Sequence, residues 1–172
     1  MPAEITGTPQ KITLLPNSMT APANPPRKTR ILFLCMGNSC RSKMAEAWTR
    51  ALHGDRIEAW SAGAEAHGLD PCTLKVMAEA GVNMAGQRSK RVDELPDLQF
   101  DYAITLCGGQ GQQCPVFPRQ AILFHAAFDD PPRLSAGART EEERLAPYRR
   151  VRDEIRQFVQ NLPRLLHHPP SQ

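Results

Sequence analysis

An apolar run that passes through a short polar loop into a helical pattern limits what this chain can fold into more than any other feature. The run is RILFLC, residues 30–35, and an unbroken apolar run of that length is typical of a strand buried on both faces. The loop covers residues 36–40, and Gly54 predicts the end of the helix that follows. The apolar side chains of that helix recur at helical spacing: Met44, Ala45, Trp48 and Leu52.

Three further segments continue this alternation. RIEAWSAG at residues 56–63, DYAITLC at 101–107 and AILFH at 121–125 have the composition of strands, and helical patterns lie between them. We therefore predict a single α/β domain with a four-stranded parallel sheet and helices on both faces. Ligands of such sheets bind at the carboxyl ends of the strands, where Cys35 and Cys107 both lie.

Capping residues mark two of the later helices. Asp70 and Pro71 predict the start of one helix. Another is expected to begin at Thr140, with Glu143 completing a capping box. Pro147 should kink or split that helix near its first turns, because proline cannot donate the usual backbone hydrogen bond.

The two ends of the chain differ from its middle. Residues 1–28 hold six of the sixteen prolines and little periodic hydrophobicity, so we expect a disordered tail there. Residues 29–166 should form the domain, and residues 167–172 a frayed end. A hydrophobic content of 41% and a charged content of 23% are ordinary for a globular protein.

Charge and cysteine content exclude several classes of protein. The net charge is only +3, and no run rich in lysine or arginine is interleaved with aromatic residues, so nucleic acid is not an expected partner. No apolar run approaches the roughly 18–20 residues of a membrane span, and the first residues lack the apolar core of a signal peptide. Five cysteines are an odd number and too few for a disulfide-stapled fold. We expect a monomeric cytoplasmic protein with reduced thiols.

The loop after the first strand has the features of an anion site. C-x5-R spans Cys35 to Arg41, and backbone N–H groups that turn inward at a helix start bind anions together with the helix dipole. The planar fork of Arg41 matches two oxygens of a tetrahedral oxyanion. The same positive field favours the nucleophilic thiolate of Cys35. The predicted oxyanion-binding residues are Gly37, Asn38, Ser39, Cys40, Arg41 and Ser42.

The motif CMGNSCRSKMAEAW resembles the anion loop of the low-molecular-weight tyrosine phosphatase fold, and in particular that of thioredoxin-coupled arsenate reductases. The similarity runs from about residue 30 to residue 166 and includes SAGAEAHGLDP, ITLCGGQGQQCPVFP, FDDP and RRVRDEI. The resemblance implies a flavodoxin-like sheet, arsenate as the substrate, no tightly bound cofactor and thioredoxin as the reductant. A glutaredoxin-like or other thiol partner leaves no motif that would distinguish it from thioredoxin.

Cysteines far from the loop separate a reductase from a phosphatase. A phosphatase needs the loop cysteine, the arginine and an acid, whereas a reductase also needs a thiol that resolves the first adduct. Cys107 ends the third predicted strand, and Cys114 follows seven residues later across a glycine-rich loop that can move. By motif position, the resemblance implies that Cys35 attacks arsenate, Cys107 then attacks Cys35, and Cys114 attacks Cys107.

An acid is expected in the segment FDDPPRL. The resemblance places it directly before the proline, at Asp130, and leaves Asp129 as a solvated neighbour. Phosphatases of this fold carry aromatic residues after this position, which shape a slot for phosphotyrosine, whereas Pro132 and two non-aromatic residues follow here. The alternative function is a tyrosine phosphatase using Cys35, Arg41 and Asp130. A further alternative, from another class, is a silent module that binds oxyanions or senses redox state.

Other candidate residues have plainer interpretations. Cys40, at a helix start, is expected to have a packing role or a minor redox role, and Cys72 a structural one. A zinc site made by the clustered cysteines is disfavoured, because their spacing does not match the usual pairs and Arg41 would repel a cation. We therefore predict no metal site. His67 is expected to lie in a turn or to support the site from behind.

A potassium ion is implied by part of the resemblance. Some relatives bind potassium beside the loop through residues that match Asn38, Glu46 and Ser61, and all three are present. Arg88 and Lys90 stand where other members carry neutral or acidic residues, and their charge disfavours a cation. We expect Asn38 to fix the backbone of the loop in either case.

Overall fold

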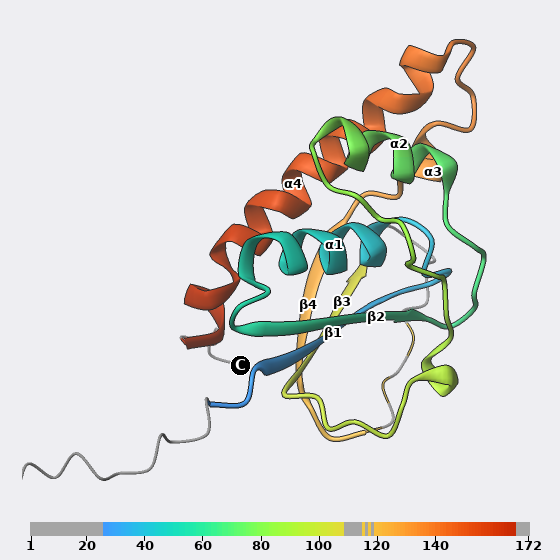
Figure 1. Cartoon of the computed structure of the whole chain (residues 1–172). Helices are drawn as coiled ribbons and strands as arrows, with labels where there is room; N and C mark the ends of the chain where they lie inside the picture. Colours follow the sequence, from blue (N-terminus) through green and yellow to red (C-terminus); the bar gives the residue numbers. More distant parts are fainter. Residues whose placement is uncertain (1–25, 109–114, 116, 118, 168–172) are drawn as a thin grey trace, which may run out of the picture.

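The computed structural model describes residues 26–108, 115, 117 and 119–167. In this part of the chain four strands form one parallel sheet in the order β2-β1-β3-β4, with β1 and β3 at its centre (Figure 1). Each strand lies where the sequence predicts one, so the four-stranded parallel sheet is confirmed. The strands are β1 (Thr29–Cys35), β2 (Ile57–Gly63), β3 (Tyr102–Cys107) and β4 (Ile122–Phe128).

Helices connect and follow these strands. The first links β1 to β2, the second and a short 3-10 helix lie between β2 and β3, and the last two follow β4. At the start of the last helix, the hydroxyl of Thr140 accepts a hydrogen bond from the backbone N–H of Glu143, which is one half of the predicted capping box. The carboxylate of Glu143 accepts the backbone N–H of Arg139 instead of that of Thr140. The helices are α1 (Arg41–His53), α2 (Pro71–Glu79), η1 (Val92–Glu94), α3 (Pro131–Leu134) and α4 (Glu141–His167).

The two faces of the sheet are covered differently. Ile31 and Phe33 of β1 pack into one apolar cluster with buried residues of α1, α2 and α4. Leu32 and Leu34 point to the opposite face, because side chains alternate along a strand. In the described residues that face is covered by η1 and loop segments rather than by an α-helix. The expectation of helices on both faces therefore holds on this face only for the short 3-10 helix. Pro96 lies two residues after the end of η1 and disfavours a longer helix there.

The register of the sheet brings two cysteines to the same edge. Leu34 of β1 pairs with Thr105 of β3, and both strands end within two residues of that pair, at Cys35 and Cys107. Neighbouring strands lie about 4.8 Å apart. The predicted meeting of these strand ends at one edge is therefore confirmed.

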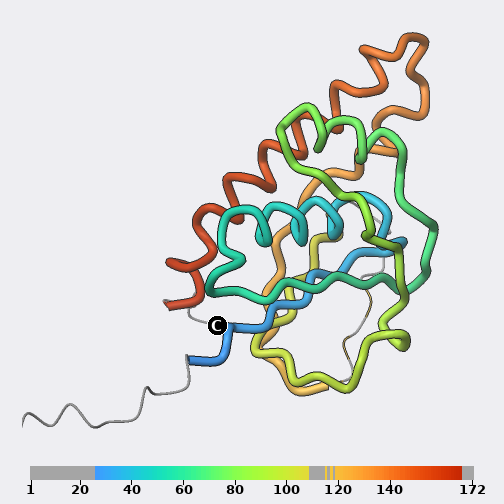
Figure 2. Tube along the Cα trace, in the orientation of Figure 1, coloured from blue at the N-terminus to red at the C-terminus, as the bar shows by residue number. Residues whose placement is uncertain are grey.

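The last helix differs from the prediction at its proline. α4 runs from Glu141 to His167 without a break at Pro147, so the predicted split is wrong, and Figure 2 shows this helix as one long stretch along the molecule. Leu145 and Tyr148, on either side of the proline, are both buried in the main core. Their burial holds the two halves in one helix although proline removes one backbone hydrogen bond.

Most of the two predicted tails, residues 1–25 and 168–172, lies outside the described residues, so their disorder and the domain boundaries stay predictions. Just before β1, the guanidinium of Arg27 pairs with the carboxylate of Asp101 at 2.9 Å. Of the helices in the described part, none is both long and apolar enough to cross a membrane.

Candidate active site

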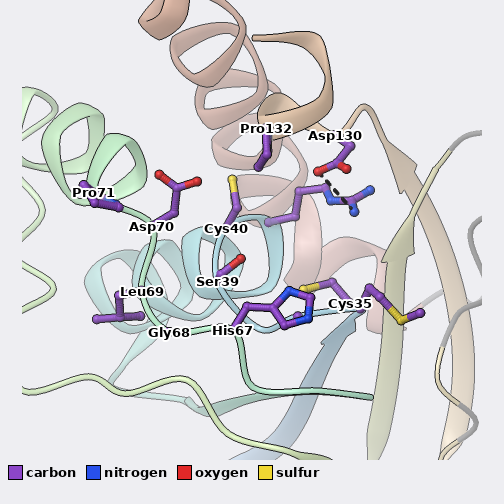
Figure 3. A pocket seen from close by; sticks show the side chains of 13 residues that line it. Cys35, Ser39, Cys40, His67, Gly68, Leu69, Asp70, Pro71, Asp130 and Pro132 are labelled. Atoms are coloured by element: carbon purple, nitrogen blue, oxygen red, sulfur yellow. Dashed lines mark ion pairs between the residues drawn. The ribbon is translucent and has the colours of Figure 1, made fainter. Parts of the chain in front are cut away.

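A cavity of about 460 Å³ opens at the carboxyl end of β1, between the loop before α1, the segment after β2 and the start of α3 (Figure 3). Five of the residues predicted for the oxyanion site or the nucleophile line it: Cys35, Gly37, Ser39, Cys40 and Arg41. The other two predicted residues, Asn38 and Ser42, are fully buried behind the loop.

Cys35 ends β1 at the bottom of this cavity. Its side chain is only 3% exposed, and its Sγ lies 2.8 Å from the hydroxyl oxygen of Ser42. The amide of Asn38 donates a hydrogen bond to that same oxygen at 2.9 Å. Because the Ser42 oxygen accepts from Asn38, the proton of its hydroxyl is available to Cys35. The Ser42 hydroxyl is therefore placed to donate a hydrogen bond to the sulfur of Cys35.

Backbone contacts hold the loop in a defined shape. Asn38 has a positive φ of 48°, and its side-chain oxygen accepts the backbone N–H of Lys90 at 2.9 Å. The carbonyl of Gly37 accepts from the backbone N–H of His67 and from the hydroxyl of Ser89, both at 3.0 Å. The expected role of Asn38 in fixing the loop is therefore confirmed. The shape of the loop thus also depends on two segments far along the chain, one at His67 and one at Ser89 and Lys90.

The start of α1 points at the cavity without a side-chain cap. Cys40 occupies the N-cap position and makes no side-chain capping hydrogen bond, and no acidic residue lies in the first turn. The first N–H groups of a helix have no partner within the helix. With the helix dipole, these N–H groups give the start of α1 the properties of the predicted anion site.

Arg41 and Asp130 face each other across the cavity. Arg41 is only 4% exposed, and its guanidinium donates to the carbonyl of Phe128 at 3.1 Å. The same guanidinium lies 3.5 Å from a carboxylate oxygen of Asp130 (dashed line in Figure 3). Asp129 instead pairs with Arg150 at 2.9 Å, on the surface. The structure thus places Asp130, and not Asp129, at the cavity.

Cys107, the first of the two predicted resolving cysteines, lies to one side of this cavity. Cys107 is buried at the end of β3 and does not belong to the cavity lining. Gly108 follows it, and a β-carbon at that position would stand 2.6 Å from the carbonyl oxygen of Phe128. That carbonyl is the one that Arg41 binds. Cys114 lies outside the described residues, so its position relative to Cys107 stays a prediction.

The remaining cysteines have surroundings that suit packing. Burial raises the pKa of the Cys40 thiol far above its ordinary value, so this side chain stays protonated. Burial also raises the pKa of Cys72, which lies on α2 outside the cavity. Within the described ranges, no three His, Cys, Asp or Glu side chains gather closely enough to hold a metal ion.

The sequence predicts only supporting roles for two residues that line the cavity. His67 lines the cavity (Figure 3). Its ring lies against Gly37, and its Nε2 is 2.5 Å from a carboxylate oxygen of Glu65. Asp70 also lines the cavity and caps α2 through the backbone N–H of Cys72. Both follow β2, whose carboxyl end adjoins that of β1. Because a parallel β1–β2 pair is predicted from the sequence, the residues that follow β2 are expected beside those that follow β1. That expectation would have identified both residues as part of the site.

The chain matches one family of proteins over most of its length. A family model described as "Low molecular weight phosphotyrosine protein phosphatase" matches residues 30–169. An arsenate reductase of Bacillus licheniformis is 47% identical over 130 residues, which cover 74% of this chain and 90% of that protein. An arsenate reductase of Bacillus subtilis is 46% identical over 125 residues, which cover 73% of this chain and 88% of that protein.

Solved structures agree with this similarity. A structure described as an arsenate reductase in the phosphate binding state has a TM-score of 0.64 and 29% identity, and the match covers 78% of this chain and 95% of that chain. The arsenate reductase of Archaeoglobus fulgidus has a TM-score of 0.62 and 31% identity, with 77% of this chain and 97% of that chain covered.

Proposed function

The chain belongs to the low molecular weight phosphotyrosine protein phosphatase family, and on that premise we propose that it is a thioredoxin-dependent arsenate reductase of arsenic detoxification. The observation that carries this proposal is the pair of buried cysteines, Cys35 and Cys107, at the ends of neighbouring parallel strands. A hydrolase needs only the first of these thiols. The names of the curated relatives support the same activity.

Arsenate binds in the cavity as a tetrahedral oxyanion. The guanidinium of Arg41 and the first N–H groups of α1 hold its oxygens. The Cys35 thiolate attacks arsenic, a sulfur–arsenic bond forms, and one oxygen leaves. Asp130 supplies the proton with which that oxygen departs as water.

Reduction takes place in the second step. The thiolate of Cys107 attacks the sulfur of Cys35, and the sulfur–arsenic bond breaks with its electron pair left on arsenic. Arsenic passes from the +5 to the +3 state and leaves as arsenite. The two thiolates lose two electrons between them and form a Cys35–Cys107 disulfide.

A third thiol returns the nucleophile to its starting state. Cys114 attacks the sulfur of Cys107, which frees Cys35 as a thiolate and leaves a Cys107–Cys114 disulfide. Thioredoxin then reduces that disulfide with a dithiol of its own. This chemistry needs a reducing compartment, which is consistent with the expected cytoplasmic location.

A coupled assay tests the proposal. Purified protein with thioredoxin, thioredoxin reductase and NADPH should consume NADPH only when arsenate is added. Replacing thioredoxin by glutaredoxin and glutathione distinguishes the two reductants. If neither thioredoxin nor glutaredoxin supports NADPH consumption with arsenate, while the protein rapidly hydrolyses an aryl phosphate, the reductase assignment is contradicted.

The Cys107→Ser variant separates reduction from oxyanion chemistry. It should lose multiple-turnover arsenate reduction and keep whatever aryl phosphatase activity the wild type has, because the cavity is formed without Cys107. Cys72→Ser is the matched control and should keep both activities, since Cys72 lies outside the cavity. Equal loss of both activities in Cys107→Ser would argue against the relay.

Phosphatase activity is the second candidate, because Cys35, Arg41 and Asp130 are the groups that phosphate-ester hydrolysis requires. No Phe, Tyr or Trp is among the described residues that line the cavity, and Pro132 lies at its edge (Figure 3). A phosphotyrosine ring would therefore find no aromatic wall. We expect weak hydrolysis of small aryl phosphates and no preference for phosphotyrosine peptides.

A further inference from the structure

A buried group of charges lies on the side of α1 away from the cavity. Lys43 and Glu46 are each only 1% exposed, and the ammonium of Lys43 is 3.1 Å from one carboxylate oxygen of Glu46. The hydroxyl of Ser61, also fully buried, donates to that same oxygen. The guanidinium of Arg50 lies 2.6 Å from the other oxygen. Both oxygens of Glu46 are therefore already bound by groups of the protein.

A second lysine approaches the same group. Burial and the neighbouring Lys43 lower the pKa of Lys90 to about 8, although the carboxylate of Glu46 acts in the opposite direction. Its side chain also lies over the ring of Trp60, at 5.9 Å from the centroid. The region around Glu46 therefore holds a surplus of positive charge from three basic side chains.

This group of charges is connected to the nucleophile. The backbone N–H of Lys90 donates to the side-chain oxygen of Asn38, whose amide donates to the hydroxyl of Ser42. That hydroxyl lies 2.8 Å from the sulfur of Cys35. The charges around Glu46 act on the side chain of Lys90, and the backbone of Lys90 holds Asn38 in the anion loop. A change in these charges can therefore change the shape of the loop.

The residues present do not fit a bound potassium ion. Asn38, Glu46 and Ser61, the residues that the resemblance implies as its ligands, are all buried here. A potassium ion takes oxygen ligands, and the carboxylate that would supply the charge is held by Lys43, Arg50 and the Ser61 hydroxyl. An added cation would have to displace an ammonium group in a region that is already positive, which is electrostatically unfavourable.

We infer that the ammonium of Lys43 takes the place of a monovalent cation, so that this chain holds its anion loop without potassium. Lys43 is thus a positioning residue that acts through Glu46, Ser61 and the Lys90–Asn38 hydrogen bond. A cation attached to the chain cannot dissociate, so the loop keeps its shape whatever the ionic composition of the solution. The inference concerns oxyanion binding and does not depend on the proposed reduction step.

The wild-type protein provides the first test. Thermal unfolding and the dissociation constant for inorganic phosphate are measured in potassium chloride and in choline chloride at equal ionic strength. Both quantities should be the same in the two salts. A phosphate affinity that rises with potassium but not with choline overturns the inference. This test uses only the wild-type protein, so it does not depend on whether a variant folds.

The Lys43→Met variant provides the second test. It removes the buried ammonium from one oxygen of the Glu46 carboxylate, while Arg50 still binds the other oxygen, and the loss of that buried ion pair is destabilising. Potassium, but not choline, should then raise its melting temperature and tighten its phosphate binding, because a ligand that binds only the folded state stabilises it. Lys43→Met/Glu46→Gln is the matched control, in which both charges are removed and the potassium response should disappear. If potassium changes neither the melting temperature nor the phosphate affinity of Lys43→Met, the inference is overturned.

Discussion

The contacts of two neighbouring aspartates differ, and only one of these side chains faces the cavity. Asp130 faces Arg41 at 3.5 Å in the cavity, whereas Asp129 points to the surface and pairs with Arg150. Adjacent residues in an extended segment point in opposite directions, so only one of the two faces the cavity. The proline that follows Asp130 starts α3 and directs the chain away from the cavity.

The Asp130→Asn variant should lower kcat for arsenate reduction by about 100-fold or more, because general acids contribute roughly 10²–10⁴-fold. Asp129→Asn should leave kcat within about twofold, since removal of a surface ion pair changes little. Steady-state kinetics of both variants in the coupled assay check this. A greater loss in Asp129→Asn than in Asp130→Asn would reverse the assignment.

The contact between Gly37 and His67 also belongs to the residue scale. A β-carbon on residue 37 would collide with the imidazole ring of His67, which supplies the three nearest atoms. Gly37→Ala should therefore displace the ring, weaken phosphate binding and lower the unfolding free energy by about 1–2 kcal/mol. Gly37→Ala/His67→Ala should recover stability relative to Gly37→Ala, because the colliding ring is absent. Additive losses in a double-mutant cycle followed by urea unfolding would show that the collision lies elsewhere.

At the scale of elements, one carboxylate joins two helices. Asp70 accepts the backbone N–H groups of Cys72 and Thr73 at the start of α2, at 2.8 and 3.3 Å. Its other oxygen accepts the hydroxyl of Tyr148 on α4 at 2.6 Å. Burial and this hydrogen bond raise the pKa of Tyr148 well above its ordinary value, so the phenol remains a donor. Asp70 also lines the cavity, so the docking of α2 on α4 shapes one of its walls.

Asp70→Ala should lower the unfolding free energy by about 2–3 kcal/mol, because it removes a cap worth about 1 kcal/mol and leaves the Tyr148 hydroxyl unsatisfied. Tyr148→Phe should cost about 1 kcal/mol. The double variant should lose less than the sum, since the two side chains share one hydrogen bond. Thr140→Ala, at the exposed start of α4, serves as control and should be additive with Tyr148→Phe. Additivity in the Asp70–Tyr148 cycle would count against the coupling.

For the whole molecule, Lys90 makes the stability depend on pH in a predictable direction. Its pKa is about 8 in the folded protein and about 10.5 in the unfolded chain, so between these values the unfolded state binds more protons. The free energy of unfolding therefore gains a contribution that rises as the pH increases from about 8 to 10.5. Below pH 8 both states are protonated, and the full cost of the buried ammonium is present.

The Lys90→Met variant removes this ionisation. It should be more stable relative to the wild type at pH 7 than at pH 9.5, because the wild type relieves its penalty as Lys90 deprotonates. Urea unfolding of both proteins at several pH values measures the difference, and Arg88→Met, whose ion pair with Glu94 is on the surface, is the control. A stability difference that does not change with pH would exclude Lys90 as the titrating group.

Much of the fold and part of the site could be predicted from the sequence because the signals are local. Four strands, the cap at Asp70 and the loop from Cys35 to Arg41 all depend on residues within a few positions of each other. The continuity of α4 through Pro147 could not be predicted, because it depends on burial against distant elements. The same holds for the face of the sheet that η1 covers.

The sequence alone determined which groups lie at the end of β1, since the strand, its terminal cysteine, the five-residue loop and the arginine at the helix start follow one another within a few positions. Only the tertiary structure decided which partners complete the site. The contacts of Gly37 with His67, of Glu46 with Ser61 and of Arg41 with Asp130 join segments that are 15 to 89 residues apart. Such contacts follow from the register of a parallel sheet and the packing of helices on it, and no local pattern encodes them.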